Sequence, residues 1–266
     1  MNDKPSKSQV DKLGKRLRSG GRVDDDDLEL LQRVRATCDD ALAAVTERLA
    51  SINVDSRPLR PTSRLKTIGT IIDKLRRESI RLSQMDDIAG ARIVIDGDLV
   101  AQDKVVRAIT AAFPDTSVKD RREHPSYGYR AVHVIVQHEA CSVEVQVRTP
   151  LQDLWAQVVE RIGDSWGREI RYGGSPETPE QKFRSRFTRH EFVGFLMDVS
   201  DNIAGLEQIE TEVETELEES QTSLKVGPPK PTGDDAKPDT SELAARIKTL
   251  KNAYQEKLKL LKKLDF

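Results

Sequence analysis

The stretch Val143-Glu-Val-Gln-Val-Arg148 alternates strictly between apolar and polar residues, and it predicts a β-strand more clearly than any other part of the chain. Successive side chains of a strand point to opposite faces, so the three valines share one face and Glu144, Gln146 and Arg148 share the other. An acid, an amide and a guanidinium in line form a natural binding surface for a polar ligand. A strand with one solvated face would show the same alternation.

A second strand is predicted over residues 129–137, joined to the first by a turn of hairpin length. Tyr129 and His133 share one face of this strand, and the hairpin can bring them beside Glu144 and Gln146. An aromatic ring next to an acid and a basic group suits a nucleotide, because the ring can stack on the base. An ordinary half-buried cross-strand pair is the alternative interpretation.

Helices and further strands are predicted around this hairpin. Residues 88–95 form a short apolar run, which predicts a buried strand, and residues 117–121 predict a short one. Apolar residues recur at three- and four-residue spacing elsewhere, which predicts amphipathic helices. Helices are expected around residues 25–49, 68–75, 100–113, 150–162, 192–217 and 241–264. This order favours the α+β class, a mixed sheet with helices packed on it.

The composition divides the chain into five segments. Residues 1–55 are expected to be a flexible segment and a helix, 56–175 the core, 176–225 amphipathic helices, 226–240 a Gly- and Pro-rich linker, and 241–266 a basic amphipathic helix. The basic helix could pack on the acidic helix before the linker, in the same chain or in a second copy. A homo-oligomer is therefore one possibility.

The charge balance and the cysteines restrict the class of protein. The 266 residues carry a net charge of −2, but lysines and arginines cluster locally, and a phosphate-bearing ligand responds to local charge. No apolar run is long enough to span a membrane and no signal peptide is evident, so a cytoplasmic protein without membrane contact is expected. Cys38 and Cys141 lie far apart without metal-site spacing and are expected to be reduced thiols.

A basic cluster precedes the buried strand, which begins directly after Asp87. Lys66 and Lys74 lie eight residues apart, so in a helix they would share one face, either as phosphate ligands or as a solvated basic surface. Carboxylates at strand ends are common ligands of Mg²⁺ in phosphoryl-transfer enzymes, because Mg²⁺ prefers hard oxygen atoms. A turn or helix cap is the alternative role for Asp87. The cluster comprises Arg64, Lys66, Lys74, Arg76, Arg77 and Arg81.

Four motifs between residues 60 and 170, taken together and in order, resemble the RelA/SpoT synthetase family. Each is weak alone, whereas all four in sequence are specific. They are Arg64-Leu-Lys66 with Ile72-Asp-Lys74-Leu75, Asp87-Ile-Ala-Gly-Ala-Arg92, Tyr127-Gly-Tyr-Arg-Ala-Val-His133, and Glu144-Val-Gln-Val-Arg-Thr149 followed by Gln152-Asp-Leu-Trp-Ala156. The chain has no room for the hydrolase and regulatory domains of the long members, so the small single-domain members are the expected relatives.

The resemblance implies a nucleotidyltransferase-like fold with N- and C-terminal helical extensions. It also implies that the β,γ-pyrophosphate of ATP moves to the ribose 3′-hydroxyl of GTP or GDP, with release of AMP and with Mg²⁺ as cofactor. Asp87 and Glu144 would be catalytic and bind Mg²⁺, or Glu144 would help to deprotonate the hydroxyl. The implied ligands of the ATP phosphates are Arg64, Lys66, Lys74, Arg77 and Arg92. The implied acceptor-binding residues are Tyr129, which would stack on guanine, Arg130, His133, Gln146 and Arg148.

Departures from the family pattern leave the acceptor open. Many alarmone-making members have an Asn before the Gly of the third motif, where this chain has Tyr127. The hairpin is short, and the helix after it reads Glu160-Arg161 instead of Glu-His. Such changes resemble toxic small members that pyrophosphorylate the 3′ end of tRNA, with residues 119–122 and 168–171 as candidate RNA contacts.

Three functions are therefore carried forward. An alarmone synthetase is favoured because Asp87, Tyr129 and Glu144 are all present. A tRNA-modifying toxin, whose C-terminal helices could bind an antitoxin or regulatory protein, is the second. A catalytically inactive module that binds a nucleotide or RNA is the third.

Overall fold

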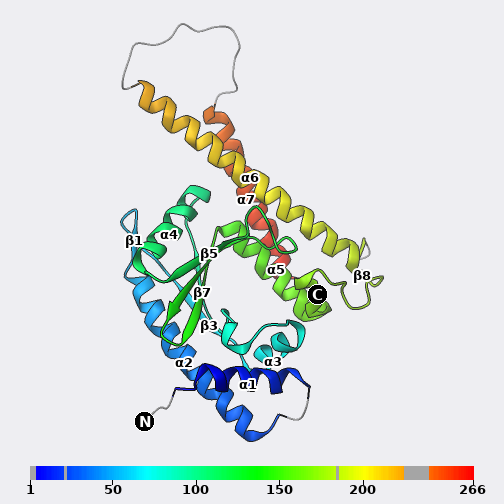
Figure 1. The fold of residues 1–266 in the computed structure, drawn as a ribbon. Coiled ribbons are helices and arrows are strands. Elements are labelled where there is room, and N and C mark those ends of the chain that lie inside the picture. The colour runs from blue at the N-terminus through cyan, green and yellow to red at the C-terminus, as the bar shows by residue number, and fades with distance from the viewer. Residues whose placement is uncertain (1–3, 21–22, 184–185, 225–239) are drawn as a thin grey trace. The chain divides into compact units, whose positions relative to one another are not determined.

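The structure is a computed structural model in which the chain forms two compact units, each described by itself below (Figure 1). It describes residues 4–20, 23–183, 186–224 and 240–266. The first unit comprises Met1–Val94, Lys104–Asp120 and Val132–Val147, and the second comprises Ile95–Asp103, Arg121–Ala131 and Arg148–Phe266.

The first unit is built on a five-stranded mixed sheet flanked by helices, which confirms the predicted α+β class. The strand order is β3-β4-β7-β6-β5. These strands are β3 (Thr62–Leu65), β4 (Ala89–Val94), β5 (Thr116–Asp120), β6 (Val132–His138) and β7 (Cys141–Arg148). β6 and β7 form the predicted antiparallel hairpin, and a separate small hairpin joins β1 (Asn53–Val54) to β2 (Arg57–Pro58).

Helix α2 (Asp25–Ala50) covers the apolar face of this sheet, with contacts to β3, β4 and β6 (Figure 1). The helix begins where the sequence predicts, because the Asp24 side chain accepts a hydrogen bond from the backbone of Asp27 and three acids occupy the first turn. Helix α3 (Ile68–Arg77) and the short 3₁₀ helix η1 (Leu82–Gln84) link β3 to β4, and α4 (Leu99–Ala112) follows β4.

The composition predicts a flexible N-terminal segment, but part of this segment is helical. Residues Lys7–Arg18 form helix α1, which packs on α2, α3 and η1. Val10, Leu13 and Leu17 are buried on one helical face, and Ser6 with Gln9 forms a capping box at its start. The polar composition conceals this helix because Val10, Leu13 and Leu17 are its only apolar residues with large side chains.

The two cysteines are joined in a disulfide, so the prediction of two reduced thiols is wrong for this structure. Cys38 lies on the buried face of α2, and Cys141 begins β7 on the same face as the valines. Packing α2 on the sheet brings the two residues together across 103 positions of sequence. A separation of this length leaves no pattern in the sequence.

The second unit is mainly helical. Its elements are α5 (Pro150–Trp166), η2 (Arg168–Tyr172), β8 (Lys182–Phe183), β9 (Phe187–Thr188), α6 (Arg189–Leu224) and α7 (Thr240–Lys262). α5 begins with Pro150 and a capping box of Thr149 and Gln152. Its buried face packs on α6 and α7, and Trp166 lies at the centre of an aromatic cluster with Phe183, Phe192 and Phe266.

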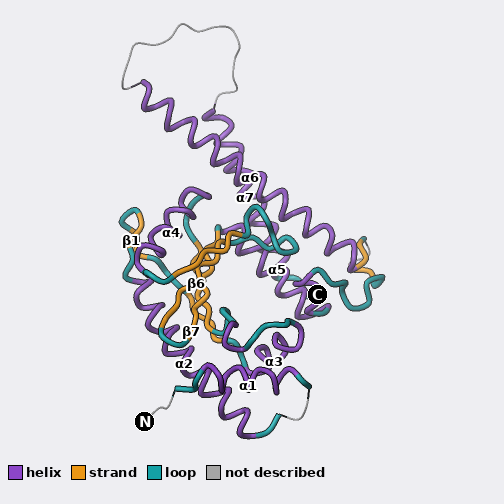
Figure 2. The backbone as a smooth tube through the Cα atoms, viewed as in Figure 1, coloured by secondary structure: helices purple, strands orange, loops and turns teal. Residues whose placement is uncertain are grey.

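The basic helix α7 lies along the acidic helix α6 in the same chain (Figures 1 and 2). An ion pair joins Lys251 to Glu210, while Ile247 and Leu258 are buried. The same-chain alternative is thus realised, and a homo-oligomer stays a prediction. The expected linker at 226–240 lies outside the described residues except for Thr240. Across the described ranges, no helix combines the length and the apolar character that a membrane span requires.

Candidate active site

Polar side chains gather on the face of the sheet opposite α2. In the antiparallel ladders Arg64 pairs with Gly90, and His133 pairs with Gln146, and directly paired residues point to the same face. Burial alternates along β7, where the valines are buried and Glu144 and Gln146 are half-buried. The predicted alternation therefore places the acid, the amide and the histidine together on one polar face.

Asp87 lies in the turn two residues before β4, between two lysines. Its Oδ2 atom is 2.7 Å from Lys74 Nζ and 3.3 Å from Lys66 Nζ. Lys74 projects from α3 and Lys66 from the segment after β3, so three elements meet at one carboxylate. The Oδ1 atom of Asp87 is buried and has no hydrogen-bond partner among the described residues. A buried carboxylate oxygen without a partner is costly, which is typical of a position that receives a ligand.

Lys74 is held in its charged form by the carboxylates around it. Burial would lower the pKa of Lys74, but the charge and hydrogen bond of Asp87 raise it, with further contributions from Glu78 and Glu144. The net direction is upward. The amine therefore carries a positive charge at neutral pH, at a place where a phosphate group would find few competing water molecules.

Glu144 is bonded at both of its oxygen atoms. His133 Nδ1 lies 3.0 Å from Oε1, and the Gln146 amide donates to Oε2 at 2.7 Å. Burial alone would raise the pKa of this carboxyl group. The hydrogen bond and charge of His133 oppose burial, and with the Gln146 amide and the Lys74 ammonium they lower the pKa to about 2. Glu144 is therefore an anion at any physiological pH.

The residues present fit a Mg²⁺ ion. The described residues contain no group of three His, Cys, Asp or Glu side chains that could hold a metal by themselves. Mg²⁺ in phosphoryl-transfer sites usually takes only one or two carboxylates and completes its shell with water and substrate phosphates. Asp87 offers an oxygen without a partner, and Glu144 offers a stable negative charge on the neighbouring strand.

Three predicted phosphate ligands lie at the edge of this cluster or outside it. Arg64 is exposed on the edge strand β3, and Arg92 is half-buried on β4, two residues after Gly90. Arg77, at the end of α3, is exposed and lies 3.1 Å from Glu78. Their predicted roles stay predictions.

Two predicted acceptor residues are joined within the second unit. Arg148 Nη2 donates to the Tyr129 hydroxyl at 3.0 Å, and the guanidinium lies 5.0 Å from the centre of the tyrosine ring. The opposite side of Arg148 bonds Asp153 Oδ1 at 3.0 Å. Arg148 is almost completely buried, so these contacts fix the orientation of Tyr129.

The chain before β6 turns where the sequence predicts a strand. β6 begins at Val132, not at Tyr129, because Tyr127 and Gly128 adopt left-handed backbone conformations. Arg130 consequently points towards α6, where it donates to Ser200 Oγ at 2.7 Å and to Asp201 Oδ1 at 2.9 Å. Its acceptor-binding role stays a prediction.

Asp153 lies within the fourth motif, but no role was predicted for it, and the structure shows that it positions Arg148. It follows the capping box of α5, in the first turn, where an acid is expected for electrostatic reasons alone. Its contact with Arg148 and a second hydrogen bond from Gln157 show that it also orients the guanidinium. In the sequence, the five-residue interval between Arg148 and Asp153 was the signal that could have indicated this ion pair.

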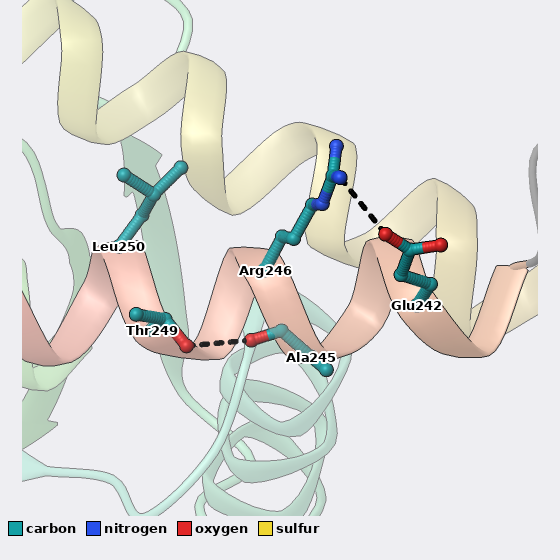
Figure 3. A pocket seen from close by; sticks show the side chains of 5 residues that line it. All are labelled: Glu242, Ala245, Arg246, Thr249 and Leu250. Atoms are coloured by element: carbon teal, nitrogen blue, oxygen red, sulfur yellow. Dashed lines mark hydrogen bonds and ion pairs between the residues drawn. The ribbon is translucent and has the colours of Figure 1, made fainter.

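An open hollow of about 450 Å³ lies on α7 (Figure 3). Arg246 Nη2 lies 2.8 Å from Glu242 Oε1, and the Thr249 hydroxyl donates to the Ala245 carbonyl at 2.9 Å. Both contacts lie within one helix, and all five lining residues are on its exposed side. The candidate active site is therefore the polar face of the sheet, with its buried carboxylates and lysines.

Known proteins resemble the part of the chain that carries the candidate site residues. Residues 63–162 match the model of a region found in RelA / SpoT proteins, and every predicted site residue lies in this range. The uncharacterized protein Rv1366 of Mycobacterium tuberculosis is 38% identical over 205 residues, which is 75% of this chain and 73% of that protein. The GTP pyrophosphokinase YjbM of Bacillus subtilis is 29% identical over 178 residues, 61% of this chain and 75% of that protein.

The fold matches a solved structure as well. The crystal structure of small alarmone synthetase 1 from Bacillus subtilis aligns over 71% of this chain and 98% of its own, with a TM-score of 0.53 and 24% identity. At this identity the likeness shows the fold alone. It confirms the nucleotidyltransferase-like architecture predicted from the motifs.

Proposed function

The chain belongs to the RelA/SpoT family of pyrophosphotransferases, and from this premise we propose that it makes an alarmone from ATP and a guanine nucleotide. The acceptor would be GTP or GDP, and the products (p)ppGpp and AMP. The proposal rests on the surroundings of the Asp87 carboxylate. Its Oδ2 atom contacts both Lys66 and Lys74, and its Oδ1 atom has no hydrogen-bond partner among the described residues. Such a site can receive a metal-bound triphosphate.

The reaction joins the 3′-oxygen of the acceptor ribose to the β-phosphorus of ATP. The bond between that phosphorus and the α,β-bridging oxygen breaks, AMP leaves, and the hydroxyl proton is released. Such a transfer depends on positioning and on stabilising charge more than on covalent chemistry. Lys66 and Lys74 would exchange their contact with Asp87 for the phosphate oxygens, and Arg64 and Arg92 would add charge from the neighbouring strands.

Asp87 and Glu144 would hold Mg²⁺. When bound, Mg²⁺ would neutralise charge on the triphosphate as a Lewis acid. The low pKa of Glu144, about 2, favours this role over that of a general base, because a carboxylate of such low basicity accepts a proton from a hydroxyl poorly. His133 and Gln146 would then act by keeping Glu144 ionised and oriented.

The acceptor would bind next to Tyr129. Its ring would contact the base, and Arg148, fixed by Asp153, would orient the ring. Because ATP and GTP are nucleotides of the cytoplasm, the reaction is expected there. Transfer to the 3′ end of tRNA is the alternative outcome of the same chemistry, since a terminal ribose presents the same hydroxyl group.

The test is an incubation of the purified protein with γ-³²P-labelled ATP and Mg²⁺. GTP, GDP and deacylated tRNA are offered separately, and products are resolved by thin-layer chromatography and denaturing gel. Label on the guanine nucleotide, abolished by EDTA, is the expected result. Label on tRNA alone would replace the alarmone with a tRNA modification. Label on no acceptor, from a folded protein, would favour an inactive binding module and overturn the proposal.

A further inference from the structure

A two-residue hairpin turn precedes β6, at residues Ser126–Tyr129. The Tyr129 amide donates to the Ser126 carbonyl at 3.0 Å, and the Ser126 amide donates to the Tyr129 carbonyl at 3.2 Å. The two central residues, Tyr127 and Gly128, have φ angles of 52° and 78°. Positive φ at both central positions is characteristic of a type I′ turn, which favours Asn, Asp or Gly.

Gly128 suits its position in this turn, whereas Tyr127 does not. A side chain at Gly128 would lie 2.7 Å from the Trp155 ring and 2.9 Å from Met197 Sδ, so glycine is required there. A tyrosine in the left-handed region is strained, because its Cβ crowds the backbone. Burial does not compensate for this strain, since Tyr127 is 56% exposed. Strained residues of this kind concentrate at functional sites.

The ring of Tyr127 rests on the backbone at Gly173. A Cβ atom added to Gly173 would lie 2.0 Å from the ring, so glycine makes room for this contact. One side of the ring is thus supported while much of its surface faces solvent. Gly174 donates its amide to the Glu169 carbonyl at 2.9 Å, and Glu169, Arg168 and Ser175 belong to the lining of a polar hollow of about 420 Å³. A hollow of this size accommodates a nucleoside.

Tyr129, two residues further on, offers less of its ring. It is half-buried against the core of α5 and α6, and the Arg148 guanidinium lies over the ring at 5.0 Å from its centre. The exposed aromatic surface of the turn therefore belongs to Tyr127. An exposed ring supported on one side by Gly173, in a segment that continues into the lining of a polar hollow, is an arrangement that stacks on a nucleobase.

We propose that Tyr127 is a second base-stacking residue of the acceptor site, and that it binds an unpaired nucleobase. The inference rests on the proposed function only in assigning that base to the acceptor. The base belongs either to a free nucleotide or to the 3′ end of an RNA, and both present the same aromatic face. The competing explanation is that Tyr127 only attaches the turn to η2 through Gly173.

The experiment compares Tyr127→Phe, Tyr127→Leu and Tyr127→Asn with the wild-type protein. Phe keeps the ring, Leu keeps an apolar side chain without a ring, and Asn suits the type I′ turn, so the last variant is expected to fold at least as stably. Binding of GTP, GDP and a short single-stranded RNA with a 3′-hydroxyl is measured by calorimetry without ATP. Leu and Asn are expected to weaken binding about tenfold, and Phe to change it by less than about twofold.

The affinity for a non-hydrolysable ATP analogue is expected to be unchanged in all three variants. The acceptor probe that loses more affinity in the Leu variant identifies the source of the base. Unchanged acceptor affinity in both Leu and Asn variants, or no acceptor binding by the wild type, would overturn the inference. So would a loss of thermal stability in Leu and Asn with acceptor affinity retained, because Tyr127 would then only hold the turn in place.

The same measurements distinguish a failure of the proposed function from a failure of this inference. Ring-dependent binding without transfer of label from ATP would contradict the pyrophosphotransferase reaction and leave this inference standing. Transfer of label with an acceptor KM that does not change in the Leu variant would contradict the inference and leave the reaction standing.

Discussion

Glu144 on the sheet of the first unit is half-buried and Glu207 on α6 of the second unit is buried, and their pKa values are shifted in opposite directions. The side chain of Glu144 is 14% exposed, and Glu207 as a whole is 2% exposed. The pKa of Glu144 is lowered to about 2, whereas that of Glu207 is raised. Burial therefore does not decide the charge of a carboxyl group in this protein.

The partners make the difference. Glu144 is bonded by His133 and lies near the Lys74 ammonium, so positive charge outweighs the cost of burial. Burial raises the pKa of Glu207, and the hydrogen bonds from the Thr149 hydroxyl and the Gln152 amide offset this only in part. The charge of Lys251 also lowers the pKa, but the nearby Glu210 carboxylate raises it. A carboxylate that stays ionised can bind a cation, whereas one that favours its neutral form is suited to a structural network.

Replacing each acid with glutamine is the strongest test of this contrast. Glu144→Gln is nearly isosteric and removes the negative charge, so we expect pyrophosphate transfer to fall by about 10³-fold or more. Glu207→Gln is the matched control and is expected to keep its turnover. Initial rates with labelled ATP measure both. Full activity in Glu144→Gln, or equal losses in the two variants, would remove the distinction between the sites.

A disulfide anchors the strand that carries Glu144. Glu144 lies on β7, which the disulfide between Cys141 and Cys38 ties to α2 across 103 residues. A cross-link over a loop of this length is expected to stabilise the fold by about 4 kcal/mol. Urea unfolding with and without dithiothreitol measures the difference.

A variant with both cysteines changed to alanine is the control, and dithiothreitol should not affect its stability. If reductant leaves the free energy of unfolding of the wild-type protein unchanged, the cysteines are thiols in solution. The prediction made from the sequence would then be correct, and β7 would be held by packing alone.

Tyr129 tests the acceptor side at a smaller magnitude. Tyr129→Ala is expected to weaken acceptor use by about 1–3 kcal/mol, because a stacking surface is lost. Tyr129→Phe keeps the ring but loses the hydrogen bond from Arg148, so its effect should be smaller. The acceptor KM at saturating ATP is the measurement. An unchanged KM in Tyr129→Ala would assign base recognition to another residue.

The smallest expected effect concerns the pH dependence of stability. Because the pKa of Glu207 is raised on folding, its contribution to stability is present below the ordinary glutamate pKa and is lost as pH rises through the raised value. The Glu207→Gln side chain does not ionise, so the melting temperature of this variant should rise relative to that of the wild type as the pH increases above the ordinary glutamate pKa. Parallel melting profiles would show that burial of Glu207 carries no pH-dependent cost.

Much of the sheet and of its polar face could be predicted because local patterns report them. Strict alternation identified β7, and it placed Glu144 and Gln146 on one face because side-chain direction in a strand has a period of two. The start of β6 could not be predicted in the same way. Tyrosine rarely adopts the left-handed backbone conformation that Tyr127 has, so the sequence did not indicate a turn there. Residues 129–131 were therefore predicted as part of the strand.

The motifs predicted the family and the set of candidate residues, and hydrophobic periodicity predicted the central hairpin and most of the long helices, since these depend on residue type and spacing. The disulfide, the bonding of Arg130 to α6 and the Asp87 oxygen that lacks a described partner depend on contacts between distant segments. The opposite pKa shifts of Glu144 and Glu207 have the same origin. Both residues are glutamates removed from most of the solvent, and only the folded chain selects which polar and charged groups surround each carboxylate.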